Sequence, residues 1–542
     1  MAELKVGEPF GVGSPNFEKL NLDLALERIR NDLKTDFIYA PHLSLIYAKA
    51  GNELKEALGQ DLKNGAYAPE LPLTIEVPKS FRIPIVATKR LGPAYSRPGS
   101  ILLPKDRLLY QAFSDLAVPV VEAGLDAERS FSHQIAVDSP SAMFQPTRKC
   151  WNDLQTALSE NAASENVQYI MKIDIAGYFN SINQHMLINV LKDSGYEKWA
   201  CDRLEICLIS FTGDRSSRGI IQGVYPSDLF GNYYMGPVDQ FLSDWGVKSA
   251  RYVDDLYVFI DSVDSAEKVL RDLIPFLRAY DLSLNENKSS ISPKTLLVTM
   301  EPDLEALFQA AVEEISDQVD EEDFDADYGF QSEWKDEDED VPDDGESDLT
   351  LAATVVLFDS VDEYPGHEEN VERFCLPLFA KAESNHAVPH VFDAFKKRPA
   401  MAQIYSAYLA KFLDDEGVTG FLTDLIQDDS LFDWQRMWVL GGLMQGGEPS
   451  DDQVKLAFDI LKDGNRHDAL RAVAAYFVGR FGTHPRRTSL RNYFAQCSPY
   501  IQSAIYASAR FWKGPEKTNA RATWGNLSFL NQLLTKAIFP AI

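Results

Sequence analysis

The stretch Ser249-Ala-Arg-Tyr-Val-Asp-Asp-Leu-Tyr-Val-Phe-Ile260 decides how the chain is interpreted. Two apolar arms flank the acidic pair Asp254-Asp255, a pattern typical of a β-hairpin with both carboxylates at its tip. Acidic pairs at turns are usually only solvated, so this pair indicates a functional site only if the surrounding sequence supports one.

Another carboxylate interrupts an apolar segment 80 residues earlier. Val167-Gln-Tyr-Ile-Met-Lys-Ile-Asp-Ile175 is predicted to be a strand that carries Asp174. Because a buried, unpaired carboxylate is expensive, we expect Asp174, Asp254 and Asp255 to converge on a cation. Carboxylate oxygens suit Mg²⁺, and two such ions could activate a 3′-hydroxyl and neutralise a leaving pyrophosphate. The sequence therefore predicts phosphoryl transfer.

Composition limits the class of protein. The chain has 542 residues, a 45% hydrophobic fraction and a net charge of −30, which predicts two to four domains with real cores. Its five cysteines are scattered and never form a Cys-x-x-Cys pair, so we expect reduced thiols and no zinc site. The N-terminus lacks a signal-peptide pattern and no 18 apolar residues run together, which predicts a cytoplasmic protein without membrane partners.

The charge is unevenly distributed. Residues 313–348 hold 19 Asp plus Glu against one Lys, or −18, which leaves −12 for the rest of the chain. We expect a solvated insertion or linker there. A calcium loop beginning at Asp323 is rejected, because Tyr328 stands where glycine is needed and Trp334 where glutamate is needed. Residues 79–107 are locally basic, with seven Lys plus Arg against one Asp.

Periodicity divides the chain into successive segments. Apolar residues at helical spacing predict an N-terminal helical lead-in, and mixed strands and helices follow it. After residue 350 small-residue-rich amphipathic helices recur, with starts about 30–37 residues apart, as in stacked HEAT-type pairs. The predicted boundaries are 1–72, 73–165, 166–300, 301–350 (a helix and the acidic insertion) and 351–542.

Further motifs stand in a fixed order around the carboxylates. Between them lies Arg218-Gly-Ile-Ile-Gln-Gly-Val-Tyr-Pro-Ser-Asp-Leu-Phe-Gly-Asn232, a Gly/Pro turn before a helix that Ser227 could cap. Leu282-Ser-Leu-Asn-Glu-Asn-Lys-Ser289 lies downstream, and Arg97-Pro-Gly-Ser-Ile-Leu-Leu-Pro-Lys-Asp-Arg107 upstream. Together these resemble, over about residues 20–300, the ordered motifs of reverse transcriptases.

The resemblance implies an α+β fold with right-hand polymerase fingers (73–165) and palm (166–300), the palm an antiparallel sheet with helices. An all-α helical-repeat domain would follow. The implied catalytic residues are Asp174, Asp254 and Asp255, and the implied metal ligands are Asp174, Ile175, Asp254 and Asp255.

The nucleotide-binding positions follow from the same resemblance. Arg97 looks like the triphosphate clamp, for which a guanidinium is well suited, and Phe179 falls at the steric gate that excludes a 2′-hydroxyl. Gln222 would contact the incoming nucleotide. Lys89 and Lys288 are further nucleotide-binding candidates, and Arg90 and Arg107 are weaker ones.

Two departures from the family pattern indicate which group of reverse transcriptases the chain resembles. Ile221 and Asp228 stand where many members carry proline, and no compact basic bundle follows the palm. The helical C-terminal half instead resembles defence-associated and abortive-infection reverse transcriptases of bacteria.

The leading hypothesis is an RNA-directed DNA polymerase of antiphage defence that uses dNTPs and two Mg²⁺, with Mn²⁺ as a substitute in vitro. Its partners would be a template or noncoding RNA and the DNA product, and a homo-oligomer is left open. One alternative is untemplated, protein-primed synthesis from a tyrosine; another is an inactive RNA-binding scaffold. The candidate priming residues are Tyr476, Tyr493, Tyr500 and Tyr506.

Overall fold

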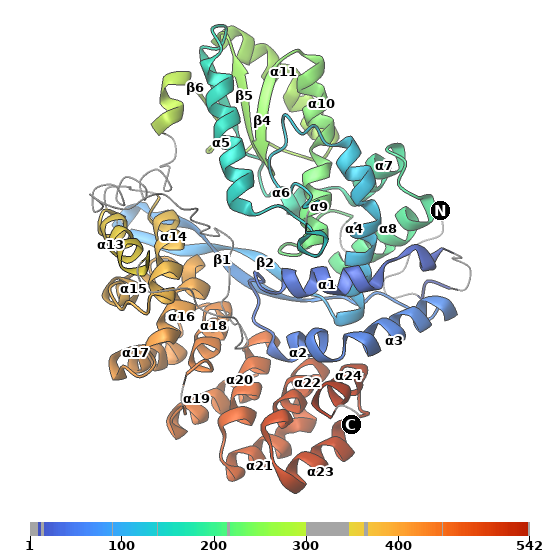
Figure 1. The fold of residues 1–542 in the computed structure, drawn as a ribbon, viewed down its shortest axis with the longest axis vertical. Coiled ribbons are helices and arrows are strands. Elements are labelled where there is room, and N and C mark those ends of the chain that lie inside the picture. The colour runs from blue at the N-terminus through green and yellow to red at the C-terminus, as the bar shows by residue number, and fades with distance from the viewer. Residues whose placement is uncertain are drawn as a thin grey trace.

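The computed structural model confirms the predicted α+β class, with a sheet-containing part followed by a helical part (Figure 1). The described residues are 9–11, 16–88, 90–137, 139–213, 217–299, 346–361, 367–446 and 448–539. The acidic stretch up to residue 345 lies outside them, as do the rejected calcium loop and the predicted helix after residue 300.

The N-terminal segment is helical, as its periodicity predicts. Its helices are α1 (Leu22–Asp32), α2 (Pro41–Lys49) and α3 (Gly51–Asn64). The side chain of Asn21 caps α1 by accepting a hydrogen bond from the Leu24 amide at 3.0 Å.

A long two-stranded hairpin crosses the middle of the molecule (Figure 1). The short apolar runs expected after residue 73 form β1 (Leu73–Ile85) and β2 (Arg90–Ile101), which pair antiparallel with Val77 opposite Arg97. Two helices follow, α4 (Pro104–Gly124) and α5 (Thr147–Ala163).

The second sheet has four strands in the order β4-β5-β3-β6, and every pair is antiparallel. The strands are β3 (Tyr169–Ile173), β4 (Lys248–Tyr252), β5 (Asp255–Ile260) and β6 (Ser290–Pro293). Six helices accompany them: α6 (Tyr178–Ser181), α7 (Gln184–Asp193), α8 (Lys198–Thr212), α9 (Tyr225–Tyr234), α10 (Gly236–Asp244) and α11 (Val263–Ala279).

From residue 346 onward the described chain contains helices and no strand. Three of these helices begin at residues 433, 468 and 499, which are 35 and 31 residues apart, within the expected spacing of 30–37 residues. The helices are α13 (Glu346–Asp359), α14 (Glu368–Lys381), α15 (Val388–Ala394), α16 (Ala402–Leu409), α17 (Glu416–Gln427), α18 (Asp433–Leu443), α19 (Asp451–Lys462), α20 (Asp468–Phe481), α21 (His484–Tyr493), α22 (Pro499–Ser508), α23 (Gly514–Trp524) and α24 (Phe529–Ile538).

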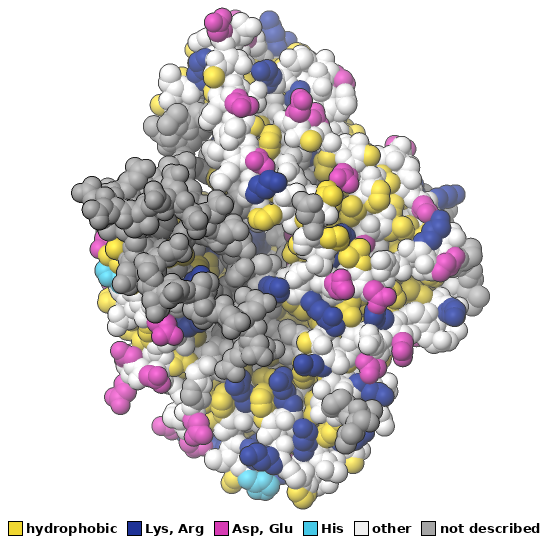
Figure 2. All heavy atoms as spheres, viewed as in Figure 1, with side chains coloured by type: hydrophobic (Ala, Val, Ile, Leu, Met, Phe, Trp, Pro, Cys, Tyr) yellow, Lys and Arg dark blue, Asp and Glu magenta, His cyan; other side chains and the backbone are white. Residues whose placement is uncertain are grey.

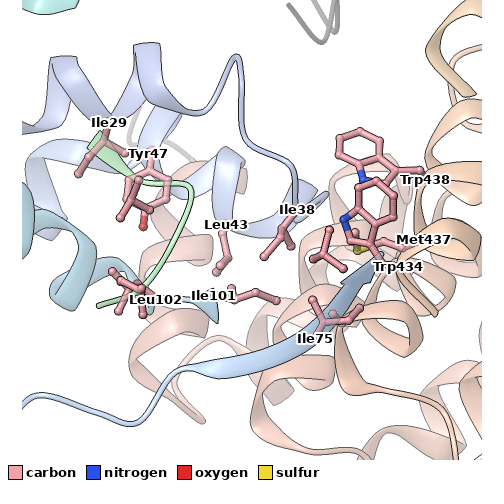
Figure 3. Packing of buried hydrophobic residues seen from close by; sticks show 14 of the residues in the cluster. Ile29, Ile38, Leu43, Tyr47, Ile75, Ile101, Leu102, Trp434, Met437 and Trp438 are labelled. Carbon is pink, nitrogen blue, oxygen red and sulfur yellow. The ribbon is translucent and has the colours of Figure 1, made fainter. Parts of the chain in front are cut away.

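One continuous core joins the N-terminal helices, the base of the hairpin and the C-terminal helices. Figure 3 shows Ile38 and Ile75 beside Trp434 of α18. The Phe37 carbonyl accepts hydrogen bonds from the indole nitrogens of Trp434 at 2.6 Å and Trp438 at 3.1 Å. These two hydrogen bonds and the shared core pack the two halves of the chain against each other.

All five cysteines are free and buried, as the sequence predicts. No helix in the described ranges is both long and apolar enough to cross a membrane.

Arg107 clamps α4 to the N-terminal segment. Its guanidinium contacts Asp32 at 2.9 Å and Asp36 at 2.8 Å, and only 8% of the residue is exposed. Burial raises the pKa of Asp32 to about 6, and Arg107 opposes that rise. Arg107 was a weaker candidate for binding nucleotide phosphates. This geometry does not favour that role, because Asp32 and Asp36 already neutralise its charge inside the fold.

Replacing Arg107 with alanine should therefore destabilise the protein. The buried carboxylate of Asp32 and the partly buried carboxylate of Asp36 would lose their cation, which typically lowers the free energy of unfolding by about 3 kcal/mol. Urea denaturation followed by circular dichroism measures this change. The control is Lys55→Ala, which breaks a pair with the 81% exposed Asp23 and should cost less than about 1 kcal/mol. Equal effects of the two variants would contradict the clamp.

Candidate active site

The three predicted catalytic carboxylates lie at the same end of the four-stranded sheet. Ile173 of β3 pairs with Leu256 of β5, so Asp174 leaves its strand where the β4–β5 turn carries Asp254 and Asp255. Burial, together with the negative charges of Asp255 and Asp174, raises the pKa of Asp254 to about 7. The structure thus brings together carboxylates that are far apart in the sequence, and their repulsion is only partly relieved by protein cations.

Residues of the downstream motif hold Asp174 in place. The Asn285 amide nitrogen Nδ2 donates to Asp174 Oδ2 at 2.8 Å, and the Asn285 backbone N–H donates to the Asp174 carbonyl at 2.8 Å. Ser289 Oγ accepts from the Asp174 N–H at 3.2 Å. Lys288, a nucleotide-binding candidate, places Nζ 3.5 Å from Asp174 Oδ1. The sequence analysis gave Asn285 no role, although it lies inside the quoted motif.

A buried polar network lies beneath the acidic turn. The Arg251 guanidinium, with no exposed surface, donates to both carboxylate oxygens of Asp239 at 2.9 and 3.0 Å. It also donates to Asn232 Oδ1 at 2.5 Å and to the Val253 carbonyl at 3.1 Å. Ser132 Oγ accepts from the Val253 N–H at 2.9 Å and donates to Asn232 Oδ1 at 3.2 Å. Both backbone polar groups of Val253 are therefore fixed from inside the protein.

Val253 has a backbone φ of +54°, which a β-branched residue rarely adopts. Such a conformation costs about 1–3 kcal/mol and persists only where the surroundings impose it. The network therefore holds a strained turn that presents Asp254, and the amino-acid type at position 253 gave no sequence signal for it.

The β1–β2 hairpin brings cations toward the carboxylates. The Arg97 guanidinium lies 5.6 Å from the Phe37 ring centroid, its buried Nε lacks a hydrogen-bond partner in the described structure, and burial lowers its pKa. Burial also lowers the pKa of Lys79, and so do the charges of Arg97 and Lys288, whereas Asp254 and Asp174 raise it. Lys79 thus lies close to the carboxylates although the sequence analysis gave it no role.

Lys89, another nucleotide-binding candidate, lies outside the described residues.

The remaining nucleotide-site candidates line the connection between α6 and α9. Phe179 packs against Gly231 of α9, where an added Cβ would come within 2.8 Å of the Phe179 ring. Gln222 donates from Nε2 to Asn180 Oδ1 at 3.4 Å. Gly223 has a φ of +80°, and a Cβ there would lie 1.7 Å from the Phe37 ring, so only glycine fits.

Two neighbouring residues of α9, Ser227 and Asp228, have polar side chains whose surroundings the sequence did not predict. Ser227 does not cap the helix: the helix begins at Tyr225, and the buried Ser227 hydroxyl pairs with the Tyr110 hydroxyl at 3.0 Å. The Asp228 carboxylate lies 4.0 Å from His133 Nε2. Burial raises the pKa of Asp228 well above its usual range, and Asp32 adds to the rise whereas Arg97 opposes it.

The donor set fits a hard divalent cation held jointly with a substrate. In the described ranges no group of three or more His, Cys, Asp and Glu side chains is arranged to hold a metal ion. Mg²⁺, however, is commonly held by one or two carboxylates together with substrate phosphates and water. Asp174 and Asp254 supply such carboxylates, and their mutual repulsion is what a cation would relieve. Ile175 is buried and could contribute only its backbone carbonyl.

The candidate priming tyrosines lie in the C-terminal helices and are mostly buried. Tyr476, Tyr500 and Tyr506 are at most 6% exposed. The ring of Tyr500 packs against His42, with ring centroids 4.7 Å apart. Tyr493 is partly exposed, and its hydroxyl donates to the Lys462 carbonyl at 3.5 Å. The structure therefore brings none of the three buried hydroxyls to the surface.

Residues 125–300 match the family model described as reverse transcriptase (RNA-dependent DNA polymerase). No curated protein matches the chain. Solved structures with similarity include apo telomerase from Candida tropicalis (13% identity, 75% of this chain, 73% of that chain, TM-score 0.30). Telomerase from Candida albicans with a TWJ fragment of telomeric RNA is similar at 12% identity (72% of this chain, 70% of that chain, TM-score 0.28). Similarity at these TM-scores assigns no function, whereas the family match covers the residues that carry Asp174, Asp254 and Asp255.

The network predicts that Ser132→Ala loosens the acidic turn. Loss of one hydrogen bond to the Val253 N–H, worth about 1 kcal/mol, should speed exchange of that amide roughly fivefold to tenfold. Hydrogen exchange of the peptide spanning residues 249–260 measures this. Ser114→Ala is the control, because Ser114 is equally buried and its hydroxyl has no partner in the described structure. Unchanged exchange in Ser132→Ala would show that the serine does not hold the turn.

The raised pKa of Asp254 predicts a pH-dependent gain in stability for Asp254→Asn. With a folded pKa of about 7 against an ordinary 3.8, the ionised group destabilises the metal-free folded state above pH 7, and this cost fades as the pH falls toward 4. The variant should therefore raise the free energy of unfolding by about 1 kcal/mol or more at pH 8 and hardly at all at pH 4. Urea titrations in a chelator measure it.

Asp261→Asn is the matched control at the other end of β5. Its exposed carboxylate accepts hydrogen bonds from Ser262 and Ser265, which lower its pKa, so its removal should bring no gain at pH 8. A gain for Asp254→Asn of the same size at both pH values would rule out the titration of Asp254 as its cause.

Proposed function

We propose that the chain is an RNA-directed DNA polymerase whose reverse transcriptase domain includes residues 125–300, and that Asp174, Asp254 and Asp255 are its catalytic centre. One observation carries the proposal: three carboxylates from two separate motifs crowd at one sheet end, facing the basic β1–β2 hairpin. Such a cluster is costly unless a cation or a cationic substrate complex uses it.

Asp174 and Asp254 would hold Mg²⁺, with the Ile175 carbonyl and Asp255 as neighbouring donors. Two bound Mg²⁺ would supply activation of a 3′-hydroxyl and neutralisation of the leaving pyrophosphate, and Mn²⁺ would replace them in vitro. Asn285 and Lys288 hold the Asp174 carboxylate in one orientation before substrate arrives. The Arg251 network does the same for the turn that carries Asp254.

The chain's own cations and aromatic side chains would position a deoxynucleoside triphosphate. Arg97, already desolvated and with an unused N–H, is suited to phosphate oxygens, and Lys79 and Lys288 add charge on the same side. Phe179, fixed against Gly231, would exclude a 2′-hydroxyl, and Gln222 would contact the nucleotide. Lys89 remains a candidate for the same site.

We extend the proposal to an RNA template and to antiphage defence. The family model supports copying of RNA, and the layout of a polymerase followed by helical repeats resembles the defence group. The scaffold alternative is disfavoured, because an inactive protein would gain nothing from crowded carboxylates. Protein priming is disfavoured for Tyr476, Tyr500 and Tyr506, whose burial would require local opening.

A primer-extension assay tests the proposal. Full-length protein with Mg²⁺, labelled dNTPs and a primed RNA template should make DNA, and Asp254→Ala should reduce synthesis by about 1,000-fold or more, since the site would lose a metal ligand. Asp261→Asn should leave synthesis unchanged. Label that remains on the protein in a denaturing gel, without template, would replace the templated function by protein priming. Absence of any synthesis with RNA, DNA or no template would overturn the proposal.

A further inference from the structure

The C-terminal end of this acidic chain is strongly basic. Residues 470–542 contain ten Lys plus Arg and one acidic residue, Glu516, a net charge of +9 in a protein of −30. The charge therefore separates along the sequence, and the last helices concentrate its positive part.

Most of these cations have no carboxylate to neutralise them. Four are paired: Arg471 with Asp468, Arg486 with Asp451, and Arg487 and Arg491 with Glu516. Within the described part of the chain the other six form no ion pair, and they are Arg480, Arg510, Lys513, Lys517, Arg521 and Lys536. Unpaired, accessible cations gathered in one region attract an anionic partner.

Aromatic rings lie between the unpaired cations. The Arg480 guanidinium is 5.0 Å from the Phe511 ring centroid, and Arg510 is 5.1 Å from the same ring. Arg521 lies 4.9 Å and Lys517 5.2 Å from the ring of Phe539. We call this set the C-terminal basic track, and its residues are Arg480, Arg510, Phe511, Lys517, Arg521 and Phe539.

The track lies on an accessible face of the molecule. Figure 2 shows Lys and Arg gathered with hydrophobic side chains over the lower lobe, where Figure 1 places α20, α22 and α24. Arg510 and Arg521 are exposed, whereas Phe511 and Phe539 are partly exposed. Both the charges and part of each ring are therefore within reach of a ligand.

Aromatic contacts extend from the track toward the active site. Tyr476 lies near Arg510 and Arg480, whose positive charges oppose the rise that burial causes in its pKa. The hydroxyl of Tyr39 is electrostatically coupled to Tyr476 and Arg480. Two residues before Tyr39, the Phe37 ring lies beneath Arg97 of the nucleotide site. Neighbouring cations and rings are thus found at several points between α20 and the hairpin.

We propose that the C-terminal basic track binds single-stranded nucleic acid that enters or leaves the active site. Cations along a surface track the phosphates, and rings between them stack on bases without requiring one sequence. An acidic protein partner would be attracted by the cations of the track but would gain little from its aromatic rings. The inference rests on the proposed polymerase function for its biological sense, but binding itself requires no catalysis.

The test measures binding by fluorescence anisotropy with labelled 20-nucleotide dT and rU strands, without dNTPs. The protein is full-length Asp254→Ala, so that failure of synthesis cannot affect the result. Adding Arg480→Ala and Arg510→Ala should weaken binding about tenfold at 0.1 M salt. It should also reduce the slope of log Kd against log salt by about 1.4, because about two phosphate contacts are lost. Adding Phe511→Leu alone should weaken binding fivefold or more with no change of slope.

The matched control replaces Arg486 and Arg487 with alanine. It removes the same charge from the same lobe, but from cations already paired with Asp451 and Glu516, so binding should change less than threefold. Circular dichroism melting checks that each variant is folded. If the variant with both Arg480→Ala and Arg510→Ala does not fold, Arg510→Gln alone, at an exposed position, replaces it.

Each outcome decides the proposal. Preference for dT identifies the product strand and preference for rU the template, and either supports the track. Equal losses in the two double variants would reduce the effect to net charge and overturn it. It would also be overturned if the Asp254→Ala protein with an intact track bound neither strand, or if a 20-residue polyglutamate bound as tightly with the same sensitivity to Arg480→Ala and Arg510→Ala.

Discussion

The buried ion pair between Arg251 and Asp239 is the constraint on which the rest of the site depends. A guanidinium without exposed surface is tolerable only if a carboxylate neutralises it and its remaining N–H groups find acceptors. Here those acceptors include Asn232 and the carbonyl of Val253. The requirement to satisfy one buried charge therefore also fixes the strained turn that carries Asp254, using groups that lie behind the catalytic face.

Phe37 forms a second junction of comparable importance. Its ring lies beneath Arg97 and fills the space that the missing side chain of Gly223 leaves open. Its carbonyl is held by Trp434 and Trp438 of the C-terminal helices. One residue thus contacts the basic hairpin, the glycine turn and the helical part, and any displacement of it would alter all three. The helical part is in this way built into the support of the nucleotide site.

The elements of the fold followed closely from local patterns, but several side-chain roles did not. Two apolar arms on either side of the acidic pair predicted the β4–β5 hairpin, since strand pairing there needs only neighbours in sequence. The role of Asn285 was missed because its partner, Asp174, is more than a hundred residues away. Ser227 was expected to be a cap from its position before a helix, yet the helix starts earlier and the hydroxyl bonds to Tyr110. Local pattern cannot show which distant element will occupy a polar group.

The sequence by itself determined the strands, the helices, the acidic turn and the order of the motifs, because periodicity and turn chemistry act between residues close along the chain. Only the tertiary structure decided which charged side chains form ion pairs inside the protein and which remain available to bind a ligand. Arg107 is neutralised inside the fold and Lys288 lies beside Asp174, whereas Arg480 and Arg510 form no ion pair with any of the described carboxylates. The physical reason is that burial and ion pairing depend on what lies within a few ångströms in space, which residue spacing along the chain does not specify.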